Sequence, residues 1–288
     1  MSRDCDLGVR SMRTVTGSAG VIKFVWQHPA NEGKRLRALG RAASFQVRAR
    51  VLHRRTIARL GWRSRIWADL HRRAASKVVY ANPPDYPEML VWRRVLQPGD
   101  LFVDVGANVG SYSIWAAELG AEVIALEPAE DTFALLKENA DLNRYPIRAI
   151  KAAAGSTCGT ARFTSGRDTV NRLDPDGSED TSMVTLDSII EHRSVSGLKI
   201  DVEGFELEVL RGCERALADG RVGLMQLEWN QASEIAMGTD RQPVADLLAR
   251  HGYSLLRPDQ RGTLAPLTDA KCGCDVFARR LPPVGKTT

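Results

Sequence analysis

The sequence of 288 residues lacks any long apolar stretch. No run approaches the roughly 18 to 20 uncharged apolar residues that a membrane-spanning helix needs, so we expect no membrane span. The N-terminal stretch MSRDCDLGVRSMRTV also lacks the apolar core of a secretory signal peptide. These two absences predict a cytoplasmic protein.

Cysteine is scarce as well, and its pattern argues against a disulfide framework. The five cysteines are odd in number and scattered along the chain, at positions 5, 158, 213, 272 and 274. Cys272 and Cys274 flank a glycine as a pair of metal ligands can, but no second Cys or His pair stands at ligand spacing. We therefore interpret them as loop residues before a final strand and predict no metal site.

Acidic side chains are rare in the first part of the chain. Residues 1–81 hold 18 Lys and Arg against 4 Asp and Glu, a net charge of +14, whereas residues 82–288 hold 22 against 31, a net charge of −9. This asymmetry predicts a basic, mainly helical N-terminal extension over 1–81 and a catalytic domain over 82–288. A basic face can attract nucleic acid, anionic lipid or an acidic substrate, or it can simply be solvated. No aromatic RNA-binding motif accompanies it, so we expect no nucleic-acid partner.

Hydrophobic periodicity outlines the elements of both parts. Within the extension, residues 30–60 follow a helical pattern, and residues 56–70 fit a short hairpin that turns between Gly61 and Ser64. Beyond the proline-rich NPPDYP, strand-like runs alternate with helical segments. The expected strands are LFVDV (101–105), AEVIALEP (121–128), PIRAIKAAA (146–154), GLKIDVEG (197–204), VGLMQLEW (222–229), YSLLR (253–257) and DVFAR (275–279).

This alternation predicts an α/β fold, with an open and mostly parallel sheet flanked by helices. One of the expected helices, 205–217, follows the strand GLKIDVEG directly. The polar stretch 155–181 is rich in Gly, Ser and Asp, and we expect loop there, with at most a short strand at ARFT (161–164).

The strand LFVDV runs into the loop GANVG, which holds Gly106, Ala107, Asn108 and Gly110. In sheets of this class, ligands bind beyond the carboxyl ends of the strands, at the switch point beside the first strand. The two glycines remove side chains where a ligand approaches the backbone and where the next helix packs closely. The helix that starts near Gly110 also offers free N–H groups toward that ligand.

An acidic residue follows the second predicted strand. Glu127 stands 21 residues after Gly106, where a carboxylate can accept both hydroxyls of an adenosine ribose, and Pro128 fixes it there by opening the next helix. Asp104 is costly to bury unpaired, so it either braces the loop or meets a cationic group of the ligand. The G-x-G-x-x-G pattern of a pyrophosphate-binding loop is absent. A ligand with a ribose, a positive sulfonium and an amino-acid tail fits better, which predicts S-adenosylmethionine as the cofactor.

Four segments together resemble FkbM-type S-adenosylmethionine-dependent methyltransferases. They are FVDVGANVGSYS (102–113), ALEPAEDTFALLKENADLN (125–143), VTLDS (184–188) and LKIDVEGFELEVLRG (198–212). The resemblance implies a class I methyltransferase (Rossmann-like) fold, in which a seven-stranded sheet is mostly parallel and its last strand antiparallel. It also implies O-methylation of a hydroxyl on a natural product, sugar or glycan.

Carboxylates at the end of the strand GLKIDVEG are the candidates for catalysis. Asp201 and Glu203 lie two residues apart and so share one side of an extended chain. A base must take the proton of an alcohol, or a metal must lower its pKa, before the oxygen attacks. We predict Glu203 or Asp201 as base or substrate-orienting group, with Lys199 as a further candidate, and expect Asp201 to contribute to the cofactor site as well. The carboxylates could instead brace the loop, cap the next helix or hold a divalent cation.

Two other classes of function share part of this pattern. An NAD(P)-dependent oxidoreductase has the same type of fold but needs the missing middle glycine. A non-catalytic binding protein could retain the fold without any activity. The favoured interpretation is a methyltransferase acting on a small-molecule or glycan acceptor, whose basic extension recognises an acidic substrate or forms a homo-oligomer interface.

Overall fold

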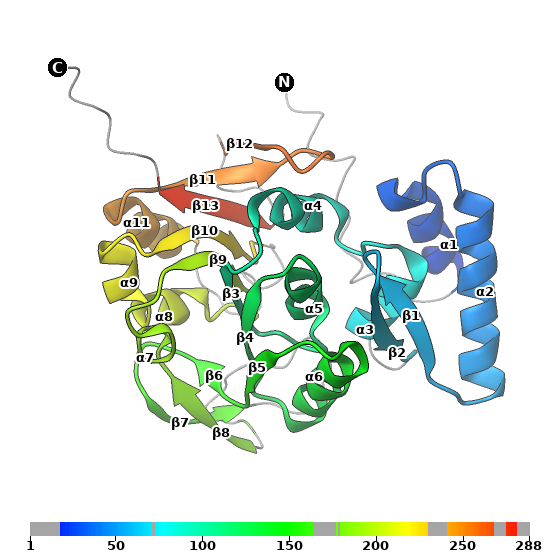
Figure 1. Cartoon of the computed structure of the whole chain (residues 1–288), viewed down its shortest axis with the longest axis horizontal. Coiled ribbons are helices and arrows are strands. Elements are labelled where there is room, and N and C mark those ends of the chain that lie inside the picture. Colours follow the sequence, from blue (N-terminus) through cyan, green and yellow to red (C-terminus); the bar gives the residue numbers. More distant parts are fainter. Residues whose placement is uncertain are drawn as a thin grey trace.

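The computed structural model describes residues 18–70, 73–163, 177, 179–229, 241–267 and 275–280. A central sheet with helices on both sides forms most of this part of the chain, and a smaller group of helices with one hairpin lies beside it (Figure 1). A separate three-stranded sheet is formed by β6 (Ala153–Ala154), β8 (Glu179–Val184) and β7 (Gly159–Phe163), in that order.

The central sheet has eight strands in the order β12-β11-β13-β10-β9-β3-β4-β5. Five neighbours run parallel: β3 (Leu101–Val105), β4 (Glu122–Leu126), β5 (Ile147–Ile150), β9 (Val195–Ile200) and β10 (Val222–Leu227). β13 (Val276–Arg280) is antiparallel to β10 and to β11 (Tyr253–Pro258), and β12 (Leu264–Pro266) pairs with β11. The predicted class I methyltransferase fold with its antiparallel last strand is confirmed, and the short edge strand β12 makes eight strands where seven were predicted.

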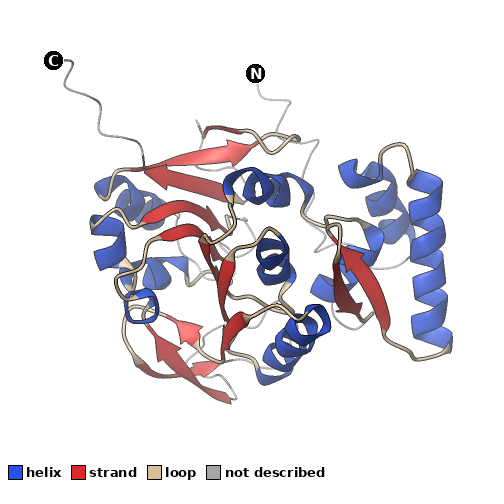
Figure 2. Cartoon of the chain, in the orientation of Figure 1, coloured by secondary structure: helices blue, strands red, loops and turns tan. Residues whose placement is uncertain are grey.

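Alternate residues of the buried strands face opposite layers of the fold. In β3, Phe102 belongs to one hydrophobic cluster, and Val103 and Val105 belong to another. The first cluster joins the sheet to α4 (Tyr86–Val95), α5 (Ser111–Glu118) and α6 (Glu130–Asn143). The second joins it to α7 (Leu186–Ile190), α8 (Glu206–Arg211), α9 (Glu214–Ala218) and α11 (Gln242–Arg250), and Figure 2 shows helices on either side of the strands. Burial on both faces explains why these strands read as continuous apolar runs.

The described part of the basic extension packs against this body. It comprises α1 (Ser18–Gln27), a 3-10 turn (Pro29–Asn31), α2 (Arg35–Val51), β1 (Thr56–Leu60), β2 (Ser64–Ala68) and α3 (Arg73–Tyr80). The hairpin turn is fixed to α5, because the Glu118 carboxylate accepts the Trp62 N–H at 2.9 Å and the Trp62 and Trp115 rings stack with centroids 6.1 Å apart. Apolar residues of the extension share the cluster of α4 and α5. A domain boundary at residue 81 stays a prediction.

Two regions differ from the sequence-based expectation of loop and strand. The predicted strand 146–154 divides into β5 and β6 (Ala153–Ala154), which belong to different sheets. In the stretch 155–181, β7 (Gly159–Phe163) overlaps the short strand expected at ARFT, whereas β8 (Glu179–Val184), which begins there, was not predicted. The two strands pair antiparallel. Pairing between these strands supplies the hydrogen bonds that their polar sequences did not predict.

The predicted helix 205–217 is also divided, into α8 and α9. The division falls at Gly212, where a Cβ would lie 2.0 Å from the Gly155 carbonyl oxygen, so the chain passes very close to the β6–β7 connection. The new helix start is capped from outside, because the Asp187 carboxylate accepts the N–H groups of Arg215 and Ala216 at 3.0 Å each. These contacts replace the helical hydrogen bonds lost at the break.

Within the described ranges, none of the helices is both long enough and apolar enough to cross a membrane. Of the cysteines, Cys5, Cys272 and Cys274 lie outside the described residues, so the interpretation of the last two as loop residues stays a prediction. Cys158 is exposed, Cys213 is buried, and both carry free thiols.

Candidate functional site

Acidic residues stand at the carboxyl ends of four adjacent strands. Asp104 is the second-to-last residue of β3. Glu127 follows β4, Asp201 follows β9 and Glu228 follows β10. These strands are neighbours in the order β10-β9-β3-β4 and run parallel, so their carboxyl ends meet at one edge of the sheet. This edge is where open α/β sheets bind ligands.

The loop after β3 lies directly against the loop after β9. The N–H groups of Gly106 and Ala107 both donate to the Leu126 carbonyl, at 3.0 and 2.9 Å. Gly106 has a φ of +75°, and a Cβ at this position would lie 1.9 Å from the Asp201 carbonyl oxygen. The Asp201 N–H in turn donates to the Val105 carbonyl at 3.0 Å. Gly106 is therefore required by the neighbouring backbone, and this close approach brings Asp201 beside the glycine loop.

Gly110 serves the packing of the next helix. It is the N-cap of α5 with a φ of +87°, and a Cβ there would lie 2.5 Å from Leu136 Cδ1 of α6. This is the close helix packing that the spacing of the two glycines predicted.

Glu127 is held by the backbone on both of its oxygens. The carboxylate accepts the Asn108 N–H at 2.9 Å and the Ala129 N–H at 3.0 Å, and the residue is 6% exposed. Burial raises the pKa of Glu127 to about 7, although the two hydrogen bonds act in the opposite direction. Each oxygen keeps a second lone pair that can accept a hydroxyl. The helix α6 begins at Glu130 with Ala129 as its N-cap, so Pro128 precedes the helix and does not open it, contrary to the prediction.

Asp104 is completely buried beneath the loop. Its Oδ2 accepts the Ser113 hydroxyl of α5 at 2.6 Å, and the pairing of β3 with β9 places it opposite Lys199. Burial raises the pKa of Asp104, while the Lys199 ammonium and the Ser113 hydrogen bond lower it to a smaller extent. Of the two roles considered from the sequence, this geometry favours bracing the loop.

Lys199 places its ammonium group among acidic and aromatic partners. Its Nζ donates to Asp201 Oδ2 at 2.8 Å and lies 4.7 Å from the centre of the Tyr112 ring. Burial by itself lowers the pKa of Lys199, but the carboxylates of Asp201 and Asp104 outweigh burial and hold that pKa above its usual range. The ammonium is therefore protonated at neutral pH and positions Asp201.

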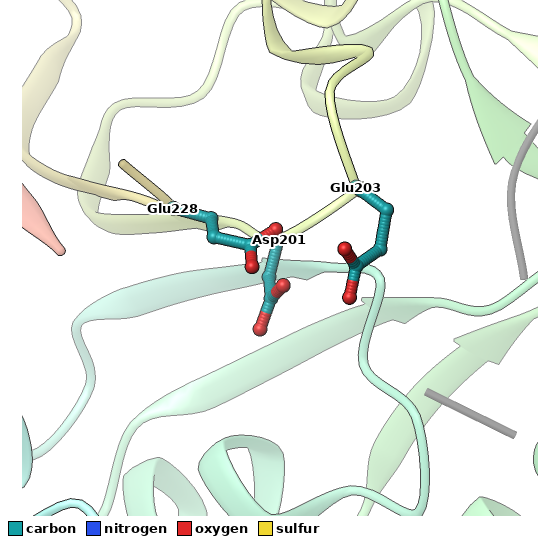
Figure 3. A group of neighbouring side chains, drawn as sticks. All are labelled: Asp201, Glu203 and Glu228. Atoms are coloured by element: carbon teal, nitrogen blue, oxygen red, sulfur yellow. The ribbon is translucent and has the colours of Figure 1, made fainter. Parts of the chain in front are cut away.

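Asp201, Glu203 and Glu228 bring their carboxyl groups together (Figure 3), with one oxygen of each within 4.8 Å of the others. Burial strongly raises the pKa of Glu228, and the charges of Asp201 and Glu203 add to this effect. Burial also favours the neutral form of Asp201, but the Lys199 ammonium and a hydrogen bond from Glu228 outweigh it and lower the pKa of Asp201. These shifts favour a protonated Glu228 beside an ionised Asp201.

The backbone turns sharply at the third member of this cluster. Glu203 has a φ of +54° and the following Gly204 a φ of +102°, so a non-glycine residue adopts a conformation that L-residues rarely occupy. Such conformations are found preferentially at functional sites. Three carboxyl groups at this spacing are also a suitable set of oxygen ligands for a divalent cation.

A buried polar network extends from this cluster toward β13. The Gln226 side chain accepts the Trp92 indole N–H at 2.6 Å and donates to the Tyr112 hydroxyl at 3.2 Å and to Asp275 at 3.1 Å. Burial raises the pKa of Asp275 to about 6, and the charge of Asp201 contributes. Sequence reasoning missed Gln226 and Asp275. The available signal was a glutamine within the apolar strand VGLMQLEW, because a buried amide requires partners.

Comparisons with known proteins identify the family of this chain. Residues 104–255 match the family described as the methyltransferase FkbM domain. The chain is 30% identical over 156 residues to the hexuronic acid methyltransferase AglP of Haloferax volcanii, covering 52% of this chain and 62% of that protein. It is 32% identical over 161 residues to the 31-O-demethyl-FK506 methyltransferase FkbM of Streptomyces tacrolimicus, covering 42% of this chain and 62% of that protein. The chain thus spans less than two thirds of either relative.

Solved structures of methyltransferases resemble the chain at low sequence identity. An S-adenosylmethionine-dependent O-methyltransferase from Thermotoga maritima has a TM-score of 0.40 and 16% identity, covering 72% of this chain and 68% of that chain. Precorrin-6y C5,15-methyltransferase from Geobacter metallireducens has a TM-score of 0.41 and 13% identity, covering 67% of this chain and 87% of that chain. The fold assignment rests on the strand order of the central sheet.

The family match confirms the resemblance expected from the four sequence segments. It also confirms the predicted methyltransferase domain and its cofactor S-adenosylmethionine, and it decides against the nicotinamide-dependent alternative. The roles of the individual residues stay predictions.

Proposed function

This chain belongs to the FkbM methyltransferase family, and we propose that it transfers the methyl group of S-adenosylmethionine to a hydroxyl of a sugar, glycan or other natural product. The observation that carries the proposal is the cluster of Asp201, Glu203 and Glu228 beside the glycine loop, at one edge of the sheet. One relative is named for 31-O-demethyl-FK506, which supports an oxygen acceptor on a natural product, and the other is named for a hexuronic acid, which supports a sugar acceptor.

The glycine loop and Glu127 fit the methyl donor. Bound S-adenosylmethionine supplies a reactive methyl group on a positively charged sulfur. Glu127 has one remaining lone pair on each oxygen, which suits the two hydroxyls of a ribose, and its ionised form is needed because only a carboxylate accepts both at once. Asp104 stays beneath the loop and supports it through Ser113.

Among the three clustered carboxyl groups, we assign the role of general base to Glu203. The Lys199 ammonium lowers the pKa of Asp201, so Asp201 is a weak proton acceptor but a good hydrogen-bond acceptor that can orient the substrate hydroxyl. The raised pKa of Glu228 favours its neutral form, which is a poor proton acceptor. The acceptor proton then passes to the Glu203 carboxylate as the acceptor oxygen takes the methyl group.

Transfer of a radiolabelled methyl group to hexuronic acid glycosides and to polyketide alcohols tests the proposal. The Glu203→Gln variant should slow transfer by about 100-fold or more, as removal of a general base does, and should bind S-adenosylhomocysteine like the unaltered protein. Glu208→Gln is the matched control, because Glu208 lies on α8 and pairs with Arg211. Equal rates for Glu203→Gln and the control would exclude Glu203 as the base. A protein that binds NADH and not S-adenosylhomocysteine would refute the proposed function itself.

A further inference from the structure

Among the residues that the structure describes, the large apolar side chains that the fold leaves exposed lie in the basic extension. Within the described ranges, the exposed large hydrophobic residues are Ile22, Trp26, Leu36, Val47, Val51, Leu52, Ile57 and Trp62. Single exposed apolar residues scattered over a surface are ordinary. A group confined to one segment instead indicates a surface that binds something outside the fold.

Helix α2 has two apolar faces, of which only one is packed. Ala38, Ala42 and Phe45 are buried against the rest of the extension. On the opposite side of the helix, residues at spacings of three and four form a second apolar stripe, made of Leu36, Gly40, Ala43, Val47 and Val51. Leu36 is 77% exposed and Val51 is 67% exposed. Figure 1 shows α2 along the outer edge of the molecule, on the far side of the extension from the sheet.

Positive charge surrounds this stripe. Residues 18–70 contain 12 Lys and Arg against 2 Asp and Glu. Arg37 and Arg48 lie on one flank of the stripe and Arg50 on the other, and all three are exposed. The cation–π contact between Arg35 and Trp26, at 5.5 Å, places an aromatic ring beside the start of α2.

A hollow of about 500 Å3 adjoins the C-terminal end of the stripe. It is lined by Arg48, Leu52, Arg54, Arg55, Thr56, Ile57 and Trp67. The Arg55 guanidinium forms an ion pair with the Glu138 carboxylate at 2.6 Å and lies over the Trp67 ring, 4.8 Å from its centre. Within the part of the chain that the structure describes, Arg48 and Arg54 have no carboxylate partner, so their guanidinium groups are available to an external anion such as a phosphate.

We propose that the outer stripe of α2 and the arginine hollow form a docking surface for a membrane that contains anionic lipids. Apolar residues flanked by Lys and Arg, with the half-exposed Trp26 beside the start of the helix, are the features of helices that lie in the interface of a lipid bilayer. The stripe is convex and inserts its side chains, while Arg48 and Arg54 contact lipid phosphates. A second copy of the chain is a poor occupant, because two such basic faces repel each other.

The inference does not depend on the proposed methyl transfer, and it is tested by sedimentation of the full-length protein with vesicles. Vesicles of phosphatidylcholine alone are compared with vesicles that also contain phosphatidylglycerol. We expect binding to the anionic vesicles only, weakened by salt. Arg48→Gln/Arg54→Gln should weaken binding about 10- to 30-fold, given about 1 kcal/mol for each basic residue at an anionic surface. Arg250→Gln/Arg261→Gln is the matched control, because both arginines are exposed elsewhere on the molecule.

The apolar part is tested separately with Leu36→Ser/Val47→Ser/Val51→Ser, which should weaken vesicle binding about tenfold or more by removing the inserted side chains. Circular dichroism and binding of S-adenosylhomocysteine should be unchanged in these variants, since the stripe lies in the solvent. Absence of binding to anionic vesicles overturns the proposal. It is also overturned if Arg250→Gln/Arg261→Gln weakens vesicle binding as much as Arg48→Gln/Arg54→Gln does. Tighter binding to RNA through Arg48 and Arg54, or a stripe variant that changes the oligomeric state without affecting vesicles, would assign the face to another partner.

Discussion

Replacement of Glu127 should weaken binding of the methyl donor in two distinguishable ways. In Glu127→Ala, the two ribose hydroxyls lose a charged acceptor, and a hydrogen bond of this kind contributes about 1.5 to 3 kcal/mol. The dissociation constant for S-adenosylhomocysteine should therefore rise about 10- to 150-fold. The alanine variant also leaves the N–H groups of Asn108 and Ala129 without their partner, so Glu127→Gln, which keeps the shape of the side chain, is the companion variant.

The pKa of Glu127, raised to about 7 by burial, adds a dependence on pH. The ionised carboxylate binds the ribose, so the affinity for S-adenosylhomocysteine should be near its maximum at pH 8 and should fall as the pH drops through the pKa. Between pH 8 and pH 6 the affinity should fall about tenfold, because the ionised fraction of a group with a pKa of about 7 falls by that factor over this range. The glutamine variant cannot ionise at this position and should lack this step.

Isothermal titration calorimetry with S-adenosylhomocysteine from pH 6 to pH 8 measures both effects. Glu130→Gln is the matched control, because Glu130 is a neighbouring exposed carboxylate that pairs with Lys151. Wild-type affinity in Glu127→Ala would refute the ribose assignment. A pH step that persists in Glu127→Gln would assign the titration to another group.

Two further predictions concern the loop contact and the carboxylate cluster. Gly106→Ala should lower the free energy of unfolding by at least about 2 kcal/mol in urea titrations, since its Cβ would overlap the Asp201 carbonyl and its φ is strained. Gly99→Ala is the control, because Gly99 has a φ of +87° with open space around it, and it should lower the free energy of unfolding by less. Equal decreases in the two variants would contradict the contact. Methyl transfer should persist after treatment with EDTA and gel filtration, because we assign proton removal to Glu203. Loss of activity that Mg2+ restores would instead assign a cation to the cluster of Asp201, Glu203 and Glu228.

The body of the fold was predictable because its strands are buried on both faces. A segment such as LFVDV is apolar at four of its five positions, and the structure places all five of its residues in the interior. The places of the glycine loop and of Glu127 were predictable, because the apolar runs before them mark where the chain leaves the sheet and close packing requires glycine there. The edge strand β12 has only three residues, and none of them is buried, so it left no hydrophobic pattern in the sequence.

The site was less predictable where residues act through distant neighbours. The glycine pattern indicated Gly106, but only the structure shows that its closest neighbour is the Asp201 carbonyl, 95 positions further along the chain. Glu228 stands within the predicted strand VGLMQLEW, yet its pKa depends on the charges of Asp201 and Glu203. These three residues come together only in the folded chain. Spacing in the sequence carries no information on such encounters between loops.

Hydrogen exchange with and without S-adenosylhomocysteine tests most directly whether the donor binds at the carboxyl edge of β3 and β4. The account predicts that the ligand slows exchange in the loop after β3, around Asn108, and in the segment after Glu127, whereas NADH has no effect. Protection confined to other segments, or no protection at saturating ligand, would contradict it.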